Sequence, residues 1–460
     1  MLDDILDYTQ HLRQRPVWQP IPAAIKAGFH TALPHQGTPL SELHTRFIND
    51  IMPYAIGNAH PGFMGWVQGG GTPVGMLAEM LAAGLNANVG GREQMPIAVE
   101  KQILHWMREL FGFPDTAQGL FVTGTSLANL IAVWIARTKH LGTQVRQDGM
   151  GVNKLTAYTS AGAHGCVSQA MDLAGFGSAA LRQIPMNAHF QIDLPQLAAA
   201  IAADQAAGLQ PFLIVGSAGT VDVGAIDDLP ALAALAQAHH CWFHIDGAYG
   251  ALGMLSAKLA PRLAGIERAD SIAFDFHKWG QVPYDAGYIL VREAADQLAT
   301  FAAPANYLKR ETRGMAAGSP WPCDFGPDLS RGFRALKTWF TLATFGTDKL
   351  GHIIDNTCAL AQYLQEHIKQ QTELQLMAPV NLNIVCFRYR GSGQLTELQV
   401  NELNGELIIR LQESGLVAPS STLINGQLVI RAAFVNHRTN RADVDTLVQT
   451  TLKLGRELNL

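Results

Sequence analysis

The stretch SIAFDFHKW at residues 271–279 follows the stretch HIDGAY at residues 244–249. Each motif ends a short apolar segment rich in residues that favour β-strands. Open α/β sheets build their sites at the carboxyl ends of strands, so we expect Asp246 and Lys278 to lie near the ends of neighbouring strands. A lysine amine in that position can react with an aldehyde.

Lys278 and Asp246 together favour one kind of chemistry. A lysine can form a Schiff base with pyridoxal 5'-phosphate (PLP), and a nearby carboxylate can keep the pyridine nitrogen of that cofactor protonated. A lone lysine beside a tryptophan is usually a solvated surface residue. The paired context favours a cofactor site.

The two motifs resemble the signature of the PLP-dependent group II amino acid decarboxylases, which include aromatic-L-amino-acid decarboxylase. The interval from Asp246 to Lys278 is 278 − 246 = 32 residues. The resemblance extends from QP at 19–20, through HPGF at 60–63, to NHRT at 436–439. It implies an α/β protein of PLP fold type I (aspartate aminotransferase-like), with a mostly parallel sheet in a large domain and a small C-terminal α+β domain.

The segment TGTSLAN at residues 123–129 reads as a turn that leads into an apolar helix. Backbone N–H groups at a helix start, with Thr and Ser hydroxyls beside them, make an anion site. Alone this pattern is only a helix N-cap signature. The resemblance assigns Thr125 and Ser126 to the cofactor phosphate.

The resemblance also implies roles for other residues. Lys278 would form the Schiff base, Asp246 would pair with the pyridine nitrogen, and His164 would stack on the ring and later serve as an acid. Further cofactor contacts are expected from residues near these three, namely Thr220, Ala248 and His277. The predicted catalytic residues are Lys278, His164 and Asp246, and no metal ligand is expected.

Three residues are candidates for the substrate pocket. Trp66 aligns with a family aromatic residue that contacts the substrate side chain, although it is equally compatible with a core position. His60 and Asn88 are compatible with the pocket or with roles in turns. An aromatic substrate is the expectation that follows from Trp66.

Two positions depart from the family pattern. Val221 follows Thr220 where a second threonine is usual, so the residue near the phenolic oxygen of the cofactor is either Thr220 or missing. Asp275 stands where many members have asparagine. An unpaired carboxylate close to phosphate is unfavourable, so we expect Asp275 to turn away or to find a cation, such as Arg331 or Arg334.

The segment 310–330 is rich in glycine and proline and is predicted to be a mobile lid rather than a packed element. In aromatic decarboxylases the corresponding lid carries a tyrosine that donates a proton after CO2 leaves. This segment has no tyrosine; its aromatic residues are Trp321 and Phe325. Either Tyr307 or His164 donates the proton instead, or the carbanionic intermediate reacts with O2, as in aldehyde synthases.

Composition and charge are those of a soluble enzyme. The 460 residues carry a formal charge of −5 and no basic block, which argues against a nucleic-acid partner. No apolar run approaches membrane-spanning length, and the acidic start at residues 1–4 is unlike a secretory signal, so the cytoplasm is expected. Five scattered cysteines indicate neither a disulfide framework nor a zinc site.

The chain divides into three predicted parts. Residues 1–55 read as helices with too few apolar positions for a core of their own. The resemblance implies that this segment wraps around a partner subunit in a homodimer; the alternative is that it caps its own large domain. Residues 56–340 alternate strands and helices and form the PLP-binding domain, and residues 341–460 form the small domain.

The expected reaction is decarboxylation of an L-amino acid, aromatic by the reasoning above, to the amine and CO2. An aldehyde synthase is the alternative within the same family. An aminotransferase would need an arginine for the substrate α-carboxylate, and Arg431 is the candidate. A PLP-binding protein without turnover is a third class.

Overall fold

The computed structural model describes residues 1–152, 154–302, 310–391 and 395–459. It divides into two compact units. One unit comprises residues 74–356, and the other comprises residues 1–73 together with 357–460. These bounds differ from the predicted domain bounds at 55/56 and 340/341.

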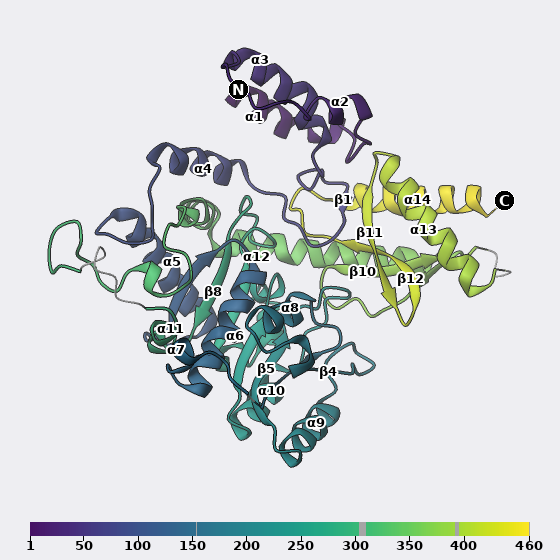
Figure 1. The fold of residues 1–460 in the computed structure, drawn as a ribbon. Coiled ribbons are helices and arrows are strands. Elements are labelled where there is room, and N and C mark those ends of the chain that lie inside the picture. Colours follow the sequence, from purple (N-terminus) through teal and green to yellow (C-terminus); the bar gives the residue numbers. More distant parts are fainter. Residues whose placement is uncertain (153, 303–309, 392–394, 460) are drawn as a thin grey trace. The chain divides into compact units, whose positions relative to one another are not determined.

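The unit 74–356 is built on a seven-stranded sheet (Figure 1). Its strand order is β2 (Gln118–Val122), β8 (Gly287–Val291), β7 (Ser271–Asp275), β6 (Trp242–Asp246), β5 (Gln210–Ser217), β3 (Leu155–Ser160) and β4 (Leu181–Ile184). All neighbouring strands are parallel except at β8, which runs antiparallel to β2 and β7. The predicted mostly parallel sheet is confirmed.

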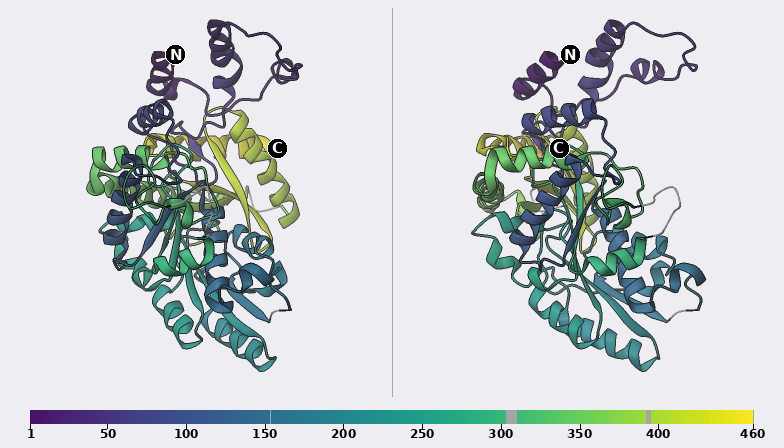
Figure 2. Two further views of the ribbon diagram at one scale, coloured as in Figure 1. Left: turned by 60° about the vertical axis from the view of Figure 1, so that its left-hand side comes forward. Right: turned by 90° about the vertical axis from the view of Figure 1, so that its left-hand side faces the viewer.

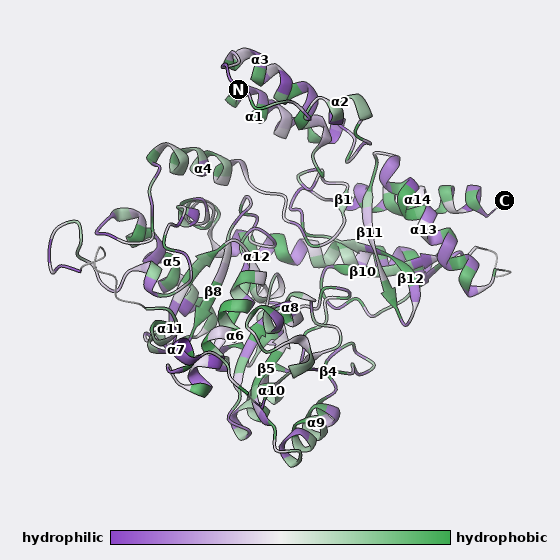
Figure 3. Ribbon diagram, viewed as in Figure 1, coloured by the Kyte–Doolittle hydropathy of each residue, from purple (hydrophilic) through white to green (hydrophobic). Residues whose placement is uncertain are grey.

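Helices cover both faces of this sheet, as the turned views in Figure 2 show. Helix α6 (Thr125–Leu141) packs across β5, β6, β7 and β8 on one face. Helix α10 (Leu229–Ala238) packs on the other face, where an added Cβ on Gly216 of β5 would lie 2.8 Å from Leu232. Successive strand residues point to opposite faces, so both faces of these strands are apolar, as the green colouring of β8 in Figure 3 illustrates.

The elements predicted at the centre of the sheet are present within one or two residues. Strands β6 and β7 match the apolar segments expected at the motifs of Asp246 and Lys278, and α10 ends at Ala238 with His239 as its C-cap. The other helices of this unit are α4 (Pro73–Leu85), α5 (Met95–Phe111), α7 (Val145–Asp148), α8 (Cys166–Leu173), α9 (Leu194–Ala206) and α11 (Ala294–Phe301).

Helix α12 (Arg334–Lys369) is the longest helix among the described residues. It is interrupted at Gly346, whose φ of 70° and ψ of 164° are not helical. Glycine adopts this backbone conformation without the steric cost that a side chain would add.

The second unit contains a five-stranded sheet. Its order is β1 (Phe63–Met64), β11 (Ala418–Ile424), β12 (Gln427–Ala433), β10 (Ile384–Tyr389) and β9 (Leu374–Leu376), flanked by α13 (Glu397–Glu413) and α14 (Arg441–Leu458). The predicted C-terminal α+β architecture is confirmed. Residues 63–64, which we placed in the large domain, instead form a strand of this sheet that pairs in parallel with β11.

The N-terminal part of the same unit consists of short helices. They are α1 (Leu2–Gln10), α2 (Ala23–Ala27) and α3 (Leu40–Arg46), with the proline-containing segment at 16–22 between the first two. Over the part of the chain that the structure describes, no helix is both long and apolar enough to cross a membrane.

Candidate active site

Asp246 and Lys278 lie at the same edge of the large sheet. Asp246 is the last residue of β6, and Lys278 follows the end of β7 by three residues. The two strands are parallel neighbours in which Asp246 is paired with Ala273. The sequence-based placement of both residues at the carboxyl ends of adjacent strands is therefore confirmed.

Asp275 makes the closest charged contact of Lys278. Its Oδ2 atom lies 2.8 Å from the Nζ atom of Lys278, and its Oδ1 atom accepts a hydrogen bond of 2.8 Å from the backbone N–H of Thr125. Asp275 is buried, whereas 23% of the Lys278 side chain is exposed. One carboxylate thus joins the reactive amine to the first turn of α6.

The expectation that Asp275 finds a cation is correct, but the two arginines named for it are wrong. Arg331 pairs with Glu100 at 2.9 Å and also donates to backbone carbonyls of Val89 and Phe121. Arg334 pairs with Asp285 at 2.9 Å. The lysine only three residues away is the partner, because the turn after β7 brings its amine back over the strand end.

Asp246 is a buried carboxylate with several donors around it. Its Oδ1 atom accepts from the backbone N–H of Ala248 at 3.1 Å, and its Oδ2 atom accepts from the amide of Asn129 at 3.1 Å. Burial raises the pKa of the Asp246 carboxyl, while the charge of Lys278 and these two hydrogen bonds oppose that rise. Such a carboxylate suits a positively charged ring nitrogen as a partner.

The start of α6 has the features of an anion site. Gly124 is its N-cap, and the hydroxyl of Thr125 is buried with no hydrogen-bond partner among the described residues. Ser126 is exposed beside it. A buried hydroxyl without a partner is unfavourable, and a phosphate oxygen would satisfy it.

His277 adds a further donor near this helix start. Its Nδ1 atom accepts from the backbone N–H of Ala286 at 3.0 Å, so in the neutral ring the proton is on Nε2. Burial lowers the pKa of His277, which favours this neutral ring. The Nε2 atom lies 3.7 Å from Asp275, and the ring packs against Tyr284 at 4.2 Å. The residues present therefore fit PLP: an amine, a carboxylate and a phosphate-binding turn at one sheet edge.

The remaining predicted cofactor residues differ in their surroundings. His164 is exposed just before α8, where its Nδ1 atom accepts from Cys166 N–H at 3.2 Å, and it interacts electrostatically with Asp246. The hydroxyl oxygen of Thr220 accepts from Ala225 N–H at 2.9 Å, which leaves its proton available to donate. The stacking role of His164 and the contact of Thr220 stay predictions.

Two of the three substrate candidates belong to the other unit. Trp66 has a positive φ of 48° and is 51% exposed, so the alternative of a core position is excluded. His60 accepts a hydrogen bond from Gly62 N–H at 2.9 Å, which is a turn role. A contact of either residue with substrate stays a prediction.

Asn88, in the unit that carries Lys278, also has a structural role. Its side-chain oxygen accepts from the backbone N–H groups of Gly90 at 2.9 Å and Arg331 at 3.0 Å. It thereby ties two loops together. This agrees with the turn alternative and does not test a contact with substrate.

The prediction that segment 310–330 is a mobile lid rather than a packed element is wrong for the part around Trp321 and Phe325. Trp321 is 1% exposed, donates to the carbonyl of Ala317 at 2.7 Å, and lies under the guanidinium groups of Arg92 and Arg310. Phe325 belongs to the core beside α6. The aromatic residues that sequence reasoning left unassigned anchor this half of the segment. Tyr307, the alternative proton donor, lies outside the described residues.

Sequence reasoning missed the partners of Asp246. Asn129 lies one turn after Thr125 on α6, and His244 lies two residues before Asp246 on the same face of β6. Both spacings are visible in the sequence, since i, i+4 positions share a helix face and i, i+2 positions share a sheet face. The sequence does not show that this face of α6 contacts this face of β6.

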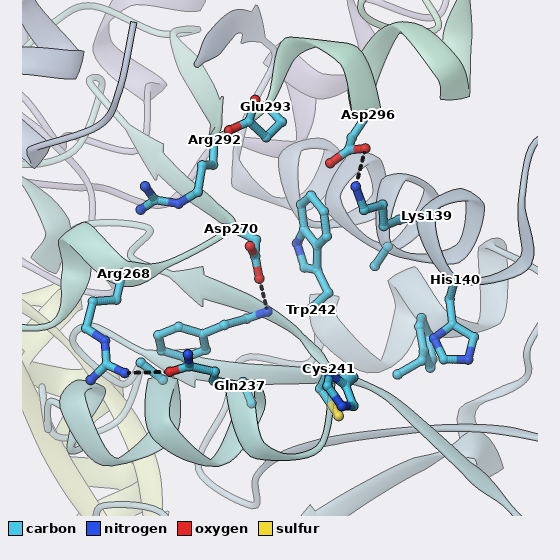
Figure 4. Close-up of a pocket in the computed structure, with 16 residues that line it drawn as sticks. Lys139, His140, Gln237, Cys241, Trp242, Arg268, Asp270, Arg292, Glu293 and Asp296 are labelled. Atoms are coloured by element: carbon cyan, nitrogen blue, oxygen red, sulfur yellow. Dashed lines mark hydrogen bonds and ion pairs between the residues drawn. The ribbon is translucent and has the colours of Figure 1, made fainter. Parts of the chain in front are cut away.

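A cavity of about 590 Å³ lies at the opposite edge of the sheet, around Trp242 at the amino end of β6 (Figure 4). Its charged groups are satisfied within the chain: Lys139 pairs with Asp296 at 2.8 Å, and Asp270 accepts from Phe243 N–H at 2.7 Å. None of the predicted site residues lines it. Within residues 1–152, 154–302, 310–391 and 395–459, no group of three His, Cys, Asp or Glu side chains could hold a metal ion.

Known proteins similar to this chain share both its sequence pattern and its fold. The pyridoxal-dependent decarboxylase conserved domain matches residues 22–390. An aromatic-L-amino-acid decarboxylase of Bacillus atrophaeus is 32% identical over 467 residues, covering 100% of this chain and 95% of that protein. A phenylacetaldehyde synthase of Petunia hybrida is 26% identical, covering 97% and 90%. The crystal structure of Oryza sativa TDC with PLP and tryptamine has a TM-score of 0.90 at 24% identity, covers 99% of this chain and 96% of that one, and supports the fold.

Proposed function

The chain belongs to the pyridoxal-dependent decarboxylase family, and from that premise we propose how its own residues serve the reaction. It is a PLP-dependent carboxy-lyase of fold type I that removes CO2 from an L-amino acid. The observation that carries the assignment of residues is the pair formed by Asp246 and Lys278 at the carboxyl ends of two parallel neighbouring strands.

When bound, PLP supplies an aldehyde for the Lys278 amine and a protonated ring that withdraws electrons from the bond broken at the substrate α-carbon. Asp246 would hold the ring nitrogen in its protonated form, because a buried carboxylate favours a neighbouring positive charge. Thr125, Ser126 and His277 would hold the phosphate. His164 would lie against the ring face, with Thr220 and Ala248 as further contacts.

Lys278 would hold PLP through its amine and would have to release it to the substrate, so its side chain needs to be both accessible and held in position. Its partial exposure gives access, and the contact with Asp275 holds the free amine at the site. Because Asp275 is itself fixed by the Thr125 N–H, the lysine has a defined position whenever it is not bonded to the cofactor.

We propose an aromatic L-amino acid as the substrate. The 32% identical relative is an aromatic-L-amino-acid decarboxylase, and the exposed indole of Trp66 is available to contact a substrate side chain. An aromatic ring gains by packing on another aromatic ring when both leave water.

The aldehyde synthase reaction is a second candidate, for a specific reason. The segment 310–330 contains no tyrosine, and its two aromatic residues are buried in packing contacts. A phenylacetaldehyde synthase is also among the similar proteins. Loss of a proton donor would favour reaction of the carbanion with O2.

We further propose a cytoplasmic homodimer. Helix α4 is largely hydrophobic in Figure 3, yet Met80, Leu81 and Leu85 are exposed, and the N-terminal helices also expose Leu40 and Leu43. Exposed apolar side chains gathered on one helix are typical of an interface. The free cysteines support the compartment.

Mass spectrometry of the products from tryptophan, tyrosine, phenylalanine, glutamate, aspartate and diaminobutyrate, with oxygen uptake recorded alongside, tests the proposal. We expect amine from an aromatic substrate without oxygen uptake. Aldehyde with oxygen uptake would assign the synthase reaction instead. Stoichiometric keto acid would assign an aminotransferase, and absence of product from every amino acid would contradict turnover.

A further inference from the structure

A continuous chain of buried side chains leads to Asp246 from the far end of its own strand. Trp242 Nε1–H donates to the Ser271 hydroxyl at 2.8 Å, and that hydroxyl lies 2.8 Å from Nδ1 of His244. Nε2 of His244 lies 2.8 Å from the amide oxygen of Asn129, whose nitrogen donates to Asp246 at 3.1 Å. We name these four residues, Trp242, Ser271, His244 and Asn129, the relay.

The hydrogen bonds of the relay can run in only one direction. Ionised Asp246 only accepts, so Asn129 must present its NH2 group there and its oxygen to His244. His244 must then carry its proton on Nε2. Burial lowers the pKa of His244 to about 3, so the ring is neutral and its Nδ1 atom accepts from Ser271. The indole N–H of Trp242 can only donate, which closes the chain at its outer end.

The fold makes this direction a stable property. Trp242, His244 and Asp246 alternate along β6 and share one face, Ser271 is paired with His244 on β7, and Asn129 approaches from α6. All four relay residues are buried, and the three inner ones, Ser271, His244 and Asn129, are at most 1% exposed, so water does not readily replace a lost bond between them. Hydrogen bonds aligned in this way polarise one another and strengthen the last one.

We propose that Asn129 and His244 are positioning residues, which keep Asp246 ionised and aimed at the ring nitrogen of the cofactor through hydrogen bonds that all donate toward it. This inference rests on the proposed role of Asp246. Burial raises the pKa of Asp246, and the hydrogen bond from Asn129 of the relay lowers it. Electrostatic interactions with Lys278 and His164 also lower this pKa. Cys166, which also faces Asp246, stays a neutral thiol because burial raises its pKa to about 12.

The protonation state of the ring nitrogen of PLP can be measured to test this inference. PLP labelled with ¹⁵N in the ring has different nitrogen chemical shifts when that atom is protonated and unprotonated, so NMR of the loaded protein measures the effect without turnover. Three variants separate the contributions. His244→Phe removes both ring nitrogens, His244→Gln keeps an N–H that can reach Asn129, and Ser271→Ala removes the hydroxyl that donates to Nδ1 of His244 and so cuts the outer half of the relay.

Thr159→Val is the matched control. Thr159 is buried in β3 of the same sheet and donates to the Val215 carbonyl at 3.2 Å, outside the relay. Like Ser271→Ala, it removes one buried hydroxyl, so a general loss of stability affects both variants. Circular dichroism confirms that each variant is folded before loading.

We expect the protonated-nitrogen signal in wild type, in His244→Gln and in Thr159→Val. His244→Phe and Ser271→Ala should shift it toward the unprotonated form, and His244→Phe should weaken PLP binding by up to about tenfold, because the buried hydrogen bond that supports Asn129 is lost. Unchanged signals in both relay-breaking variants would overturn the inference. An unprotonated ring in wild type, or a protonated one in Asp246→Asn, would instead overturn the role of Asp246 on which it rests.

Discussion

Asp275 holds the amine of Lys278 at 2.8 Å with one carboxylate oxygen, while its other oxygen caps the first turn of α6 at Thr125. The residue that replaces the usual asparagine thus touches both the lysine proposed to bond PLP and the turn proposed to bind its phosphate. Its negative charge makes this site different from one built with an amide. The consequences of that difference can be measured.

Lys278→Ala should abolish the visible absorbance of the PLP Schiff base, because it removes the amine proposed to bond the aldehyde beside Asp246. Absorption spectra after loading and desalting give the result. Lys139→Ala, which removes an exposed lysine paired with Asp296 at the other edge of the sheet, is the control and should keep the absorbance. A Lys278→Ala protein with the wild-type spectrum would sink the assignment.

Asp275→Asn should tighten PLP binding, by up to about tenfold, because a carboxylate near a dianionic phosphate is repulsive and an amide is not. The amide oxygen can still accept from Thr125 N–H. Titration of apoprotein with PLP at several salt concentrations measures the effect, which should shrink as salt screens the charge.

Two further variants serve as controls for the PLP titration of Asp275→Asn. Asp275→Ala leaves the helix start uncapped and should cost about 1 kcal/mol of stability, which Asp275→Asn should largely avoid. Asp285→Asn, at a carboxylate that pairs with Arg334, should leave PLP affinity unchanged. Weaker PLP binding by Asp275→Asn would show that holding the Lys278 amine matters more than repulsion.

Asp227 should make stability depend on pH in the acid range. Burial raises its pKa from 3.8 to about 6, although its oxygens accept from the backbone N–H groups of Ile192 at 2.7 Å and Ser217 at 2.8 Å. Because the pKa of Asp227 is higher in the folded state than in the unfolded state, Asp227 makes a contribution to the free energy of unfolding that is fully present below pH 3.8. This contribution is lost as the pH rises through 6. The loss is about 3 kcal/mol at 1.36 kcal/mol per pKa unit.

The comparison that isolates this contribution is wild type against Asp227→Asn. The difference between their free energies of unfolding, followed by urea denaturation from pH 4 to pH 7, should change as the pH rises to about 6 and should level off above that value. A constant difference would contradict a raised pKa of Asp227.

Trp321→Ala should destabilise the folded segment 321–326 and the loop at residues 90–92. Removing a buried indole costs about 3–5 kcal/mol, and here the two stacked guanidinium groups of Arg92 and Arg310 lose their partner as well. Limited proteolysis and the unfolding midpoint measure the loss. Met315→Ala, at a side chain that is 77% exposed in the same segment, should behave as wild type.

Leu81→Asp combined with Leu85→Asp should convert the proposed dimer to monomer, because two charges on α4 cannot be buried without partners. Light scattering after size-exclusion chromatography gives the mass. The control is Leu398→Asp on α13, also an exposed leucine, which should stay dimeric. A monomeric wild type, or a double variant of unchanged mass, would exclude this interface.

The sequence pattern was sufficient to predict the features that depend on local structure. The apolar segments that form β6 and β7, and the positions of Asp246 and Lys278 at the ends of these strands, follow from periodicity and from the rule that parallel strands end at one edge. The start of α6 at Thr125 follows from its turn and cap residues. Each depends on neighbours a few residues away.

Only the tertiary structure decided which groups meet. Asn129 reaches Asp246 across 117 residues of chain, β1 pairs with β11, and Trp321 is buried against a distant loop. Asp275 shows the same limit at short range, since it pairs with Lys278 while Arg331, one of the cations expected for it, pairs with Glu100. Local sequence sets the direction and face of each element, whereas the partner of a buried polar group is selected by all the groups that packing brings within hydrogen-bond distance.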